Sequence, residues 1–200
     1  MPTTTNNGWP TPADTDLVKN GADAIRDLGQ AIDTTLGVYS AVTPGSVKIS
    51  TTTFSGVATQ SFNNVFSTTY DNYKILVKIT GSTSTALNFR LRVSGTDTST
   101  NYYWAGNYQR YDQTTESGEN GNNVAQGQIG GLQSVRGFHV VEINQPFLAT
   151  PTQYSSLGFD AEYKRHYAGA QSGSTSFDGI TLIALSGTMT GTVSVYGYNK

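Results

Sequence analysis

Two hydrophobic periods divide the chain near residue 45. Before this point, apolar and small residues recur at alternating spacings of three and four, the heptad period of helices that pack against other helices. After it, apolar and polar residues alternate with a period of two, which is typical of antiparallel strands with one buried face. We therefore expect an N-terminal helical segment, residues 1–45, followed by a β-domain, residues 46–200.

The heptad positions are Val18, Gly21, Ile25, Leu28, Ile32 and Thr35. They predict a helix that is most secure over residues 22–36, with Gly37 as the residue after its end, because glycine adopts a positive φ at no cost. The start has two candidates, a cap at Thr11 followed by Pro12 or a later cap at Asn20. A helix of this length is marginal in water when isolated, so we expect neighbouring polypeptides to order it.

The residues of the heptad do not fix by themselves how many copies associate, because isoleucine alternates with glycine, leucine and threonine at the core positions. β-Branched residues at these positions shift the preference upward from two helices. We expect a homotrimer in which attachment and association use Trp9, Val18, Ile25, Leu28 and Ile32. An alternative stays open, namely a helix that docks into a different protein, because the positions beside the seam are small: Ala22, Ala24, Gly29 and Ala31.

The alternating segments predict a mainly β fold. They cover residues 47–49, 73–79, 87–93, 138–140, 157–163 and 192–198, and residues 180–185, apolar on both sides, suit a central strand. Turn dipeptides such as Asn120-Gly121 and Asp178-Gly179 separate these segments. About eight strands with no helices between them indicate an antiparallel, jelly-roll-like sandwich.

Composition removes several classes of function. The chain has no Cys and only two His, so we expect no disulfide, no metal site and no cofactor. The net charge is −2, whereas a nucleic-acid-binding protein usually has an excess of lysine and arginine that contacts phosphates. No apolar run approaches the roughly 18–20 residues of a membrane span, and the N-terminus is polar where a secretion signal is apolar. We expect cytosolic synthesis and neither a nucleic-acid partner nor membrane insertion.

The sequence also lacks the common catalytic motifs, including the nucleophile elbow, the phosphate loop and the zinc-protease helix. His139 lies within an alternating segment, and we interpret it as a residue on a solvent or interface face of a strand. We therefore expect that this chain is not an enzyme. A glycan-cleaving enzyme remains the alternative, because glycosidases need only two suitably spaced carboxyls and five are candidates: Glu116, Glu119, Glu142, Asp160 and Glu162.

The densest group of aromatic residues is the candidate ligand-binding site. It comprises Tyr102, Tyr103, Trp104, Tyr108 and Tyr111, beside the polar segment 112–123. Amphipathic rings next to amide and guanidinium groups suit stacking on sugars. The competing interpretation, which we favour, is that alternate rings fill the core or a subunit interface.

Two parts of the sequence resemble a known group of proteins. Trp9-Pro10, followed by Asp16-x-Val18-x-x-Gly21-Ala22-x-Ala24-Ile25-x-x-Leu28-x-x-Ala31-Ile32-Asp33, resembles the N-terminal segment of many tailed-bacteriophage virion proteins, particularly minor tail and tail-fibre proteins. The pattern Phe62-x-x-Val65-Phe66-x-x-x-Tyr70-x-x-Tyr73, with the closing Gly191-Thr192-Val193-x-Val195-Tyr196-Gly197, looks like the β-rich distal domains of such proteins.

This resemblance implies a homotrimeric component of a virion. Its N-terminal segment would attach to other virion proteins, and its β-domain would bind a glycan or protein on the host surface, as in a short tail fibre or receptor-binding subunit. A capsid-decoration or head-fibre protein is the structural alternative. The resemblance contains no binding motif, so it transfers no receptor-contacting residue.

Overall fold

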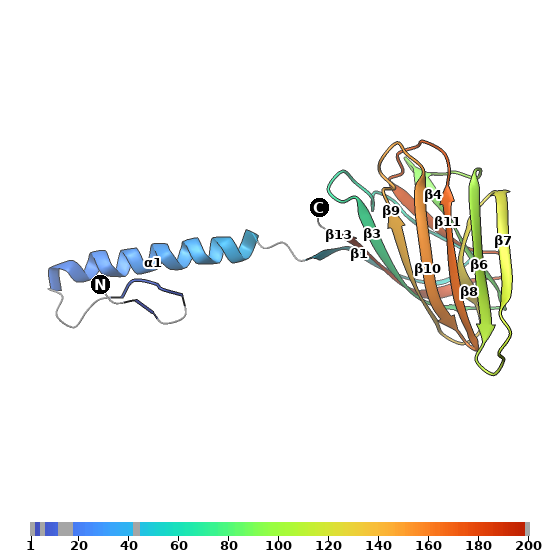
Figure 1. Cartoon of the computed structure of the whole chain (residues 1–200), viewed down its shortest axis with the longest axis horizontal. Coiled ribbons are helices and arrows are strands. Elements are labelled where there is room, and N and C mark those ends of the chain that lie inside the picture. Colours follow the sequence, from blue (N-terminus) through green and yellow to red (C-terminus); the bar gives the residue numbers. More distant parts are fainter. Residues whose placement is uncertain (1–2, 5–6, 12–17, 42–44, 199–200) are drawn as a thin grey trace. The chain divides into compact units, whose positions relative to one another are not determined.

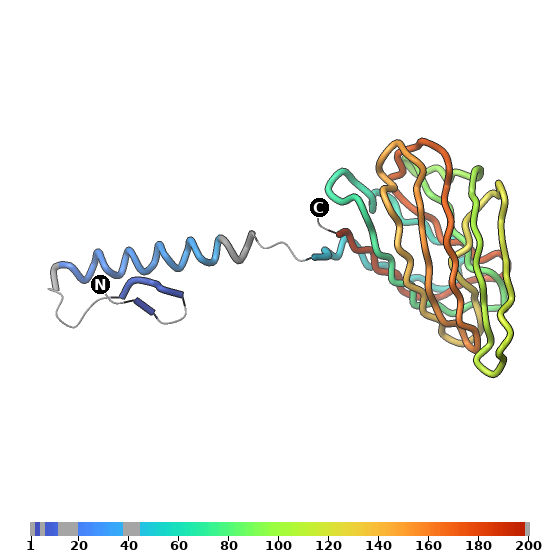
Figure 2. The backbone as a smooth tube through the Cα atoms, in the orientation of Figure 1, coloured from blue at the N-terminus to red at the C-terminus, as the bar shows by residue number. Residues whose placement is uncertain are grey.

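The structure is a computed structural model, and it describes residues 3–4, 7–11, 18–41 and 45–198. The chain forms two compact units, Met1–Pro44 and Gly45–Lys200. This division lies one residue from the boundary expected from the change of hydrophobic period. Figures 1 and 2 show a helix in the first unit and strands throughout the second.

The first unit is built around helix α1 (Val18–Ala41). The helix includes Asn20, so a start capped by Asn20 is wrong, and the earlier candidate at Thr11 and Pro12 falls partly outside the described residues. The prediction that Gly37 follows the helix is also wrong, since the helix continues for four further residues. A glycine inside a helix costs only about 1 kcal/mol relative to alanine, which continued backbone hydrogen bonding offsets.

A short turn precedes the helix and folds back onto it. Thr3 and Pro10 form an antiparallel bridge, and the amide of Thr4 donates to the carbonyl of Trp9 at 2.9 Å. Gly8 has a φ of 64°, a backbone conformation that favours glycine. The indole Nε1 of Trp9 donates to Oγ1 of Thr35 at 2.9 Å, which fastens this turn to the helix.

The second unit contains strands and connecting turns over residues 45–198. The strands are β1 (Ser46–Val57), β2 (Thr59–Phe62), β3 (Asn72–Gly81), β4 (Thr85–Val93), β5 (Thr96–Asp97), β6 (Tyr102–Arg110), β7 (Ser117–Val124), β8 (Gly127–Leu132), β9 (Gly137–Asn144), β10 (Thr152–Asp160), β11 (Tyr163–Gln171), β12 (Gly179–Ala184) and β13 (Met189–Tyr198).

These strands form two antiparallel sheets. The larger has eight strands in the order β1-β13-β3-β9-β10-β11-β6-β7, and the smaller has the order β2-β12-β4-β5, with β8 also paired to β4. The sheets pack face to face (Figure 1). The expected fold class, a mainly β antiparallel sandwich preceded by an N-terminal helix, is therefore confirmed. The jelly-roll form of that sandwich stays a prediction.

The core lies between the two sheets and follows from the period of two. In β3, Tyr73, Ile75, Val77 and Ile79 are buried, whereas the residues between them point outward. Phe89 of the smaller sheet packs edge-on against Tyr154 and Tyr102 of the larger one, with ring centroids 4.7 and 5.8 Å apart. Such aromatic pairs stabilise a core beyond the area that they bury.

The described residues contain no helix that is both long enough and apolar enough to cross a membrane.

Candidate functional site

Serine and threonine hydroxyl groups of β1 and β13 form one part of the outer face of the eight-stranded sheet. Side chains that lie opposite each other across these strands are hydrogen-bonded in pairs: Thr51 with Ser194 at 2.9 Å, Thr53 with Thr192 at 3.0 Å and Ser55 with Thr190 at 3.4 Å. These hydroxyls face solvent. Each pair uses one donor, so every pair keeps acceptor and donor capacity for a ligand.

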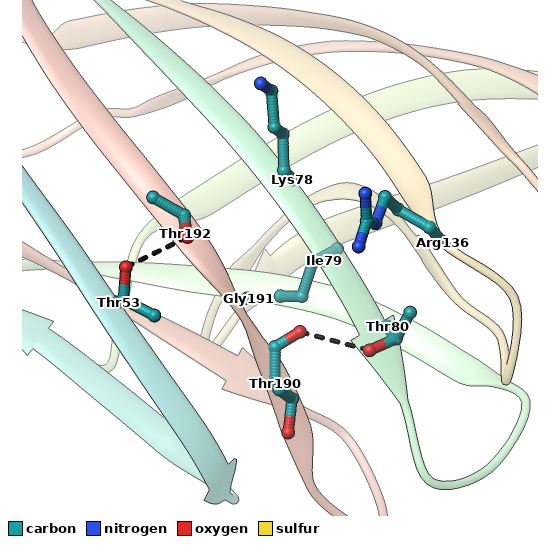
Figure 3. Close-up of a pocket in the computed structure, with 8 residues that line it drawn as sticks. All are labelled: Thr53, Lys78, Ile79, Thr80, Arg136, Thr190, Gly191 and Thr192. Atoms are coloured by element: carbon teal, nitrogen blue, oxygen red, sulfur yellow. Dashed lines mark hydrogen bonds between the residues drawn. The ribbon is translucent and has the colours of Figure 1, made fainter.

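A pocket opens where this hydroxyl surface meets β3 and the start of β9. It encloses about 270 Å³, slightly below the usual range of small-molecule sites. Figure 3 shows Lys78 and Arg136 on one side of the pocket and the hydroxyl pair of Thr53 and Thr192 on the other. The remaining lining residues are Ile79, Thr80, Thr190 and Gly191. We call this the cationic pocket.

The two cations of the pocket differ from most cations of the β-unit. Lys74, Arg92, Arg110, Lys164 and Arg165 each form an ion pair with a carboxylate. Among the described residues, neither Lys78 nor Arg136 has a carboxylate within ion-pair distance. Their charges are therefore not neutralised by a carboxylate within the described part of the chain, and both side chains line one small pocket.

An exposed apolar patch adjoins the cationic pocket. It consists of Phe138, Leu157 and Phe159, whose exposed fractions are 40%, 58% and 47%. In the strand register Phe138 lies between Lys78 on β3 and Phe159 on β10. The outer sheet face thus places the exposed Phe138 opposite Lys78 in the strand register.

The cationic pocket combines residues that are distant in the sequence. Lys78 and Arg136 are 58 positions apart in the sequence, and only the pairing of β3 with β9 brings their strands together. One signal was available, because Lys74 and Lys78 occupy the outward positions of an alternating segment.

The five aromatic residues of the predicted ligand site do not share one surface. Tyr102 is fully buried, and its hydroxyl donates to the carbonyl of Thr98 and accepts from the amide of Leu91. Trp104 and Tyr108 lie on the same inward side of β6, whereas Tyr103 is 40% exposed on the outer face. Tyr111 follows the strand and is 68% exposed. Ligand binding by Tyr103 and Tyr111 stays a prediction.

Tyr103 lines a separate shallow groove on the outer face. Small residues of β11, Ala168, Gly169 and Ala170, form part of it, together with the carboxamides of Asn144 and Gln153. A tyrosine ring above small residues and beside two amides has the polarity that sugar binding requires. The groove carries no charged side chain.

The predicted association residues of the helix occupy two neighbouring faces. Leu28 is half-buried on the face of Ala24, Ala31 and Thr35, beside which Trp9 packs. Ile25 and Leu36, exposed by 67% and 59%, share the other face with the exposed Gly29 and the half-buried Ile32. We call Ile25, Gly29, Ile32 and Leu36 the exposed helix stripe. Val18 begins the helix, and its side chain falls outside the described residues.

His139 corrects a further expectation. It is fully buried on the inward side of β9, in line with Val141 and Ile143, so its interpretation as a residue on a solvent or interface face is wrong. Glycines make room for it, because a Cβ at Gly130 or Gly158 would lie within 2.3 Å of its ring. Burial lowers the pKa of His139 to about 4, which keeps the imidazole neutral at pH 7.

A buried polar network lies beside His139. The Arg165 Nε donates to the Asp160 carboxylate at 2.6 Å, and these side chains are only 11% and 1% exposed. Burial raises the pKa of Asp160 despite this partner. The Arg165 guanidinium also lies 5.2 and 5.3 Å from the ring centroids of Tyr108 and Tyr163. Tyr108 thus contributes to packing around a buried cation.

The carboxyls of the glycosidase alternative are all held by partners. Glu116, Glu142 and Glu162 are paired with Lys164, Lys74 and Arg110. Glu119 accepts hydrogen bonds from Gln128 and Tyr167 at 2.7 and 2.9 Å. A general acid needs a raised pKa and contact with its substrate. Asp160 has the raised pKa, but its side chain is closed to solvent.

Comparison with known proteins gives no assignment. No protein-family model, no curated protein and no solved structure matches the chain.

Proposed function

We propose that this chain is a non-catalytic virion attachment protein of the tailed-bacteriophage type, a short trimeric tail fibre or receptor-binding subunit. The N-terminal unit associates with its copies and attaches to other virion proteins. The β-unit binds a glycan or protein on the host surface. The resemblance of residues 8–37 to the N-terminal segment of phage tail proteins supports this proposal, as does the division into a helical unit and a β-sandwich.

The exposed helix stripe is the observation that carries the proposal. Its members follow spacings of four, three and four, the period of a coiled-coil seam. Ile25 and Leu36 expose more than half of their surfaces on a helix that has a single buried hydrophobic residue, Ala24, among its described side chains. Association with identical helices would bury these aliphatic side chains, and burial of apolar surface stabilises the assembly. Glycine at position 29 permits close approach of the helices.

Trimerisation also explains how weak binding by a single β-unit becomes effective. Three tethered copies convert later contacts with a surface into intramolecular events, and the overall affinity exceeds that of one site by about 10²–10⁴ when the geometry permits simultaneous binding. A small, open site such as those on the outer sheet face needs this gain.

The test places a charge in the seam. The double variant Ile25→Asp/Ile32→Asp should reduce the mass measured by light scattering to the 21.4 kDa of one chain, because burying two carboxylates per helix is costly. Gln30→Asp, on an exposed position outside the stripe, is the matched control and should keep the assembled mass. An unchanged mass in the double variant would contradict the role of the stripe.

A truncation separates association from docking. A chain that lacks residues 1–40 should be monomeric if the helix holds the trimer together. If the truncated chain remains trimeric, the helix instead serves docking into another virion protein. Immunolabelling of intact particles viewed by electron microscopy then tests whether the protein is part of the tail.

A further inference from the structure

We propose that the cationic pocket binds the anionic group of an acidic saccharide, a sugar residue that carries a carboxylate, sulfate or phosphate. This inference adds the chemical class of the ligand to the proposed attachment function. Only the biological role of the binding rests on that function. Its physical basis is the pocket formed by Lys78, Arg136 and the surrounding threonines.

The charges of the pocket supply the first argument. Lys78 and Arg136 line one pocket, and neither has a carboxylate partner among the described residues, in a chain whose net charge is −2. The positive charge is therefore a local property of this site. A guanidinium group forms two parallel hydrogen bonds to a carboxylate, sulfate or phosphate, and an ammonium group adds a point charge.

The hydroxyl groups of the pocket supply the second argument. Thr53 and Thr192 are bonded to each other at 3.0 Å, and Thr80 donates to the carbonyl of Thr190 at 3.2 Å (Figure 3). The Thr53–Thr192 pair has two hydroxyl protons, of which the mutual bond uses one. These groups can therefore donate to, and accept from, the hydroxyls that surround an anionic substituent on a sugar ring.

The neighbouring apolar patch distinguishes a sugar from a simple anion. Phe138 is 40% exposed and lies opposite Lys78 in the pairing of β3 with β9. Sugar rings have an apolar C–H face that packs against aromatic carbon, and their anionic substituents lie at the ring's edge. A site with an exposed aromatic side chain next to two cations in one pocket matches both features at once.

The number of cations argues against a nucleic acid. Binding to a phosphate backbone uses a row of lysine and arginine contacts. Here two unpaired cations share a pocket of about 270 Å³, and the adjoining surfaces are uncharged hydroxyls and apolar side chains. The site suits one charged sugar residue within a chain.

The test compares ligands that differ only in charge. Tetragalacturonate and its fully methyl-esterified form present the same sugar rings with and without carboxylates. Titration of the isotopically labelled full-length protein, followed by NMR at low ionic strength, should show saturable shifts at the amides of Lys78, Arg136 and Thr192 with the acid only. Sulfated and phosphorylated tetrasaccharides, in parallel titrations, identify which anion binds most tightly.

Variants test the role of the two cations. The double variant Lys78→Met/Arg136→Gln should weaken binding of tetragalacturonate by about tenfold or more, because it removes charge-assisted hydrogen bonds from both cations. Lys78→Arg should keep most of the affinity. Lys48→Met is the matched control, since it removes an exposed positive charge on β1 that has no carboxylate partner among the described residues, and it should change affinity less than about twofold.

Each outcome decides the inference. Equal binding of the acid and the ester, equal losses in the Lys48 and pocket variants, or no saturable binding of any acidic saccharide would overturn it. Saturable binding of inorganic phosphate without binding of any acidic saccharide would show a simple anion site and would also contradict the proposed ligand. A lower assembled mass in the pocket variant would instead indicate a protein contact. Loss of saccharide binding with an unchanged mass supports the inference, and a failed trimer with intact binding contradicts only the proposed assembly.

Discussion

The two units of this protein differ in how much of their apolar surface they bury themselves. In the β-unit, hydrophobic side chains from both sheets fill a continuous core, including five aromatic rings that are at most 2% exposed: Phe66, Tyr73, Phe89, Tyr102 and Phe177. In the N-terminal unit, Ala24 is the buried hydrophobic side chain among the described residues, while Ile25 and Leu36 face solvent. The β-unit therefore has a core of its own, whereas we expect the helix to need additional contacts.

This contrast suits the N-terminal unit to assembly and the β-unit to recognition. A unit that satisfies its own core has its outer face available for ligands, and the β-unit combines unpaired cations, hydroxyls and an apolar patch on that face. A unit that leaves aliphatic side chains at heptad spacing exposed has its surface available for other helices.

The largest expected effect breaks the self-sufficient core. Phe89→Ala removes a ring that packs against Tyr102 and Tyr154, and it should lower the free energy of unfolding of the β-unit by about 3–5 kcal/mol, measured by urea denaturation. The matched change in the other unit, Ile25→Ala, should leave the unfolding of the β-unit unchanged. Equal losses in both variants would show that the units do not fold independently.

The pH dependence of stability should include a contribution of about 2 kcal/mol from His139. Its pKa is about 4 in the folded chain and near 6.5 when unfolded, so the unfolded state binds the extra proton between these values. The β-unit should lose about 2 kcal/mol of stability between pH 7 and pH 4.5. Asp160 has a raised pKa, so its protonation stabilises the folded state as the pH falls. This contribution is present in both the wild type and His139→Gln, and comparing the two proteins therefore removes it. A difference between wild type and variant that does not change with pH would contradict this assignment.

A smaller effect concerns the turn that packs on the helix. Thr35→Val removes the acceptor of the Trp9 indole, and a hydrogen bond of this kind is worth about 1 kcal/mol. We expect faster hydrogen exchange at the backbone amides of α1 and no change in the β-unit. Thr34→Val, on an exposed neighbouring position whose hydroxyl donates to the Gln30 carbonyl, is the control. Equal acceleration in both variants would show that the indole contact does not stabilise the helix.

The smallest effect is expected at the exposed end of the aromatic cluster. Tyr111→Ala should change the free energy of unfolding by less than about 0.5 kcal/mol, since the side chain is 68% exposed. Tyr102→Ala, nine positions earlier, should destabilise the β-unit severely because its ring is fully buried. Thermal unfolding of the two variants measures this contrast, and similar shifts in melting temperature would contradict the placement of the two rings.

Local patterns predicted the class of the fold but only some of its elements. No expected segment covers β2, β5, β6, β7 or β8, and the expected segment 157–163 crosses the turn between β10 and β11. The period of two predicted several β-strands, because a buried sheet face imposes alternation directly on the sequence. The same rule separates Tyr102 and Trp104 from Tyr103, so the split of the aromatic cluster follows from residues that are adjacent in the chain.

Other features depend on contacts that no local pattern contains. The helix passes Gly37 because the cost of one glycine is small, and the turn around Trp9 depends on Thr35, 26 positions away. The cationic pocket requires the registers of β3 with β13 and β9, which bring Lys78 beside Thr192 and Phe138. The burial of His139 is ambiguous in the sequence, because Val141 and Ile143 share its phase of the alternation while Phe138 and Val140 occupy the opposite one. The glycines that admit its ring lie on other strands.

The proposed trimer requires copies of this chain to cover the exposed helix stripe, and sedimentation equilibrium of the unmodified full-length protein measures this association. At micromolar concentration we expect a mass three times the 21.4 kDa of one chain. A mass of one chain across that concentration range would contradict it.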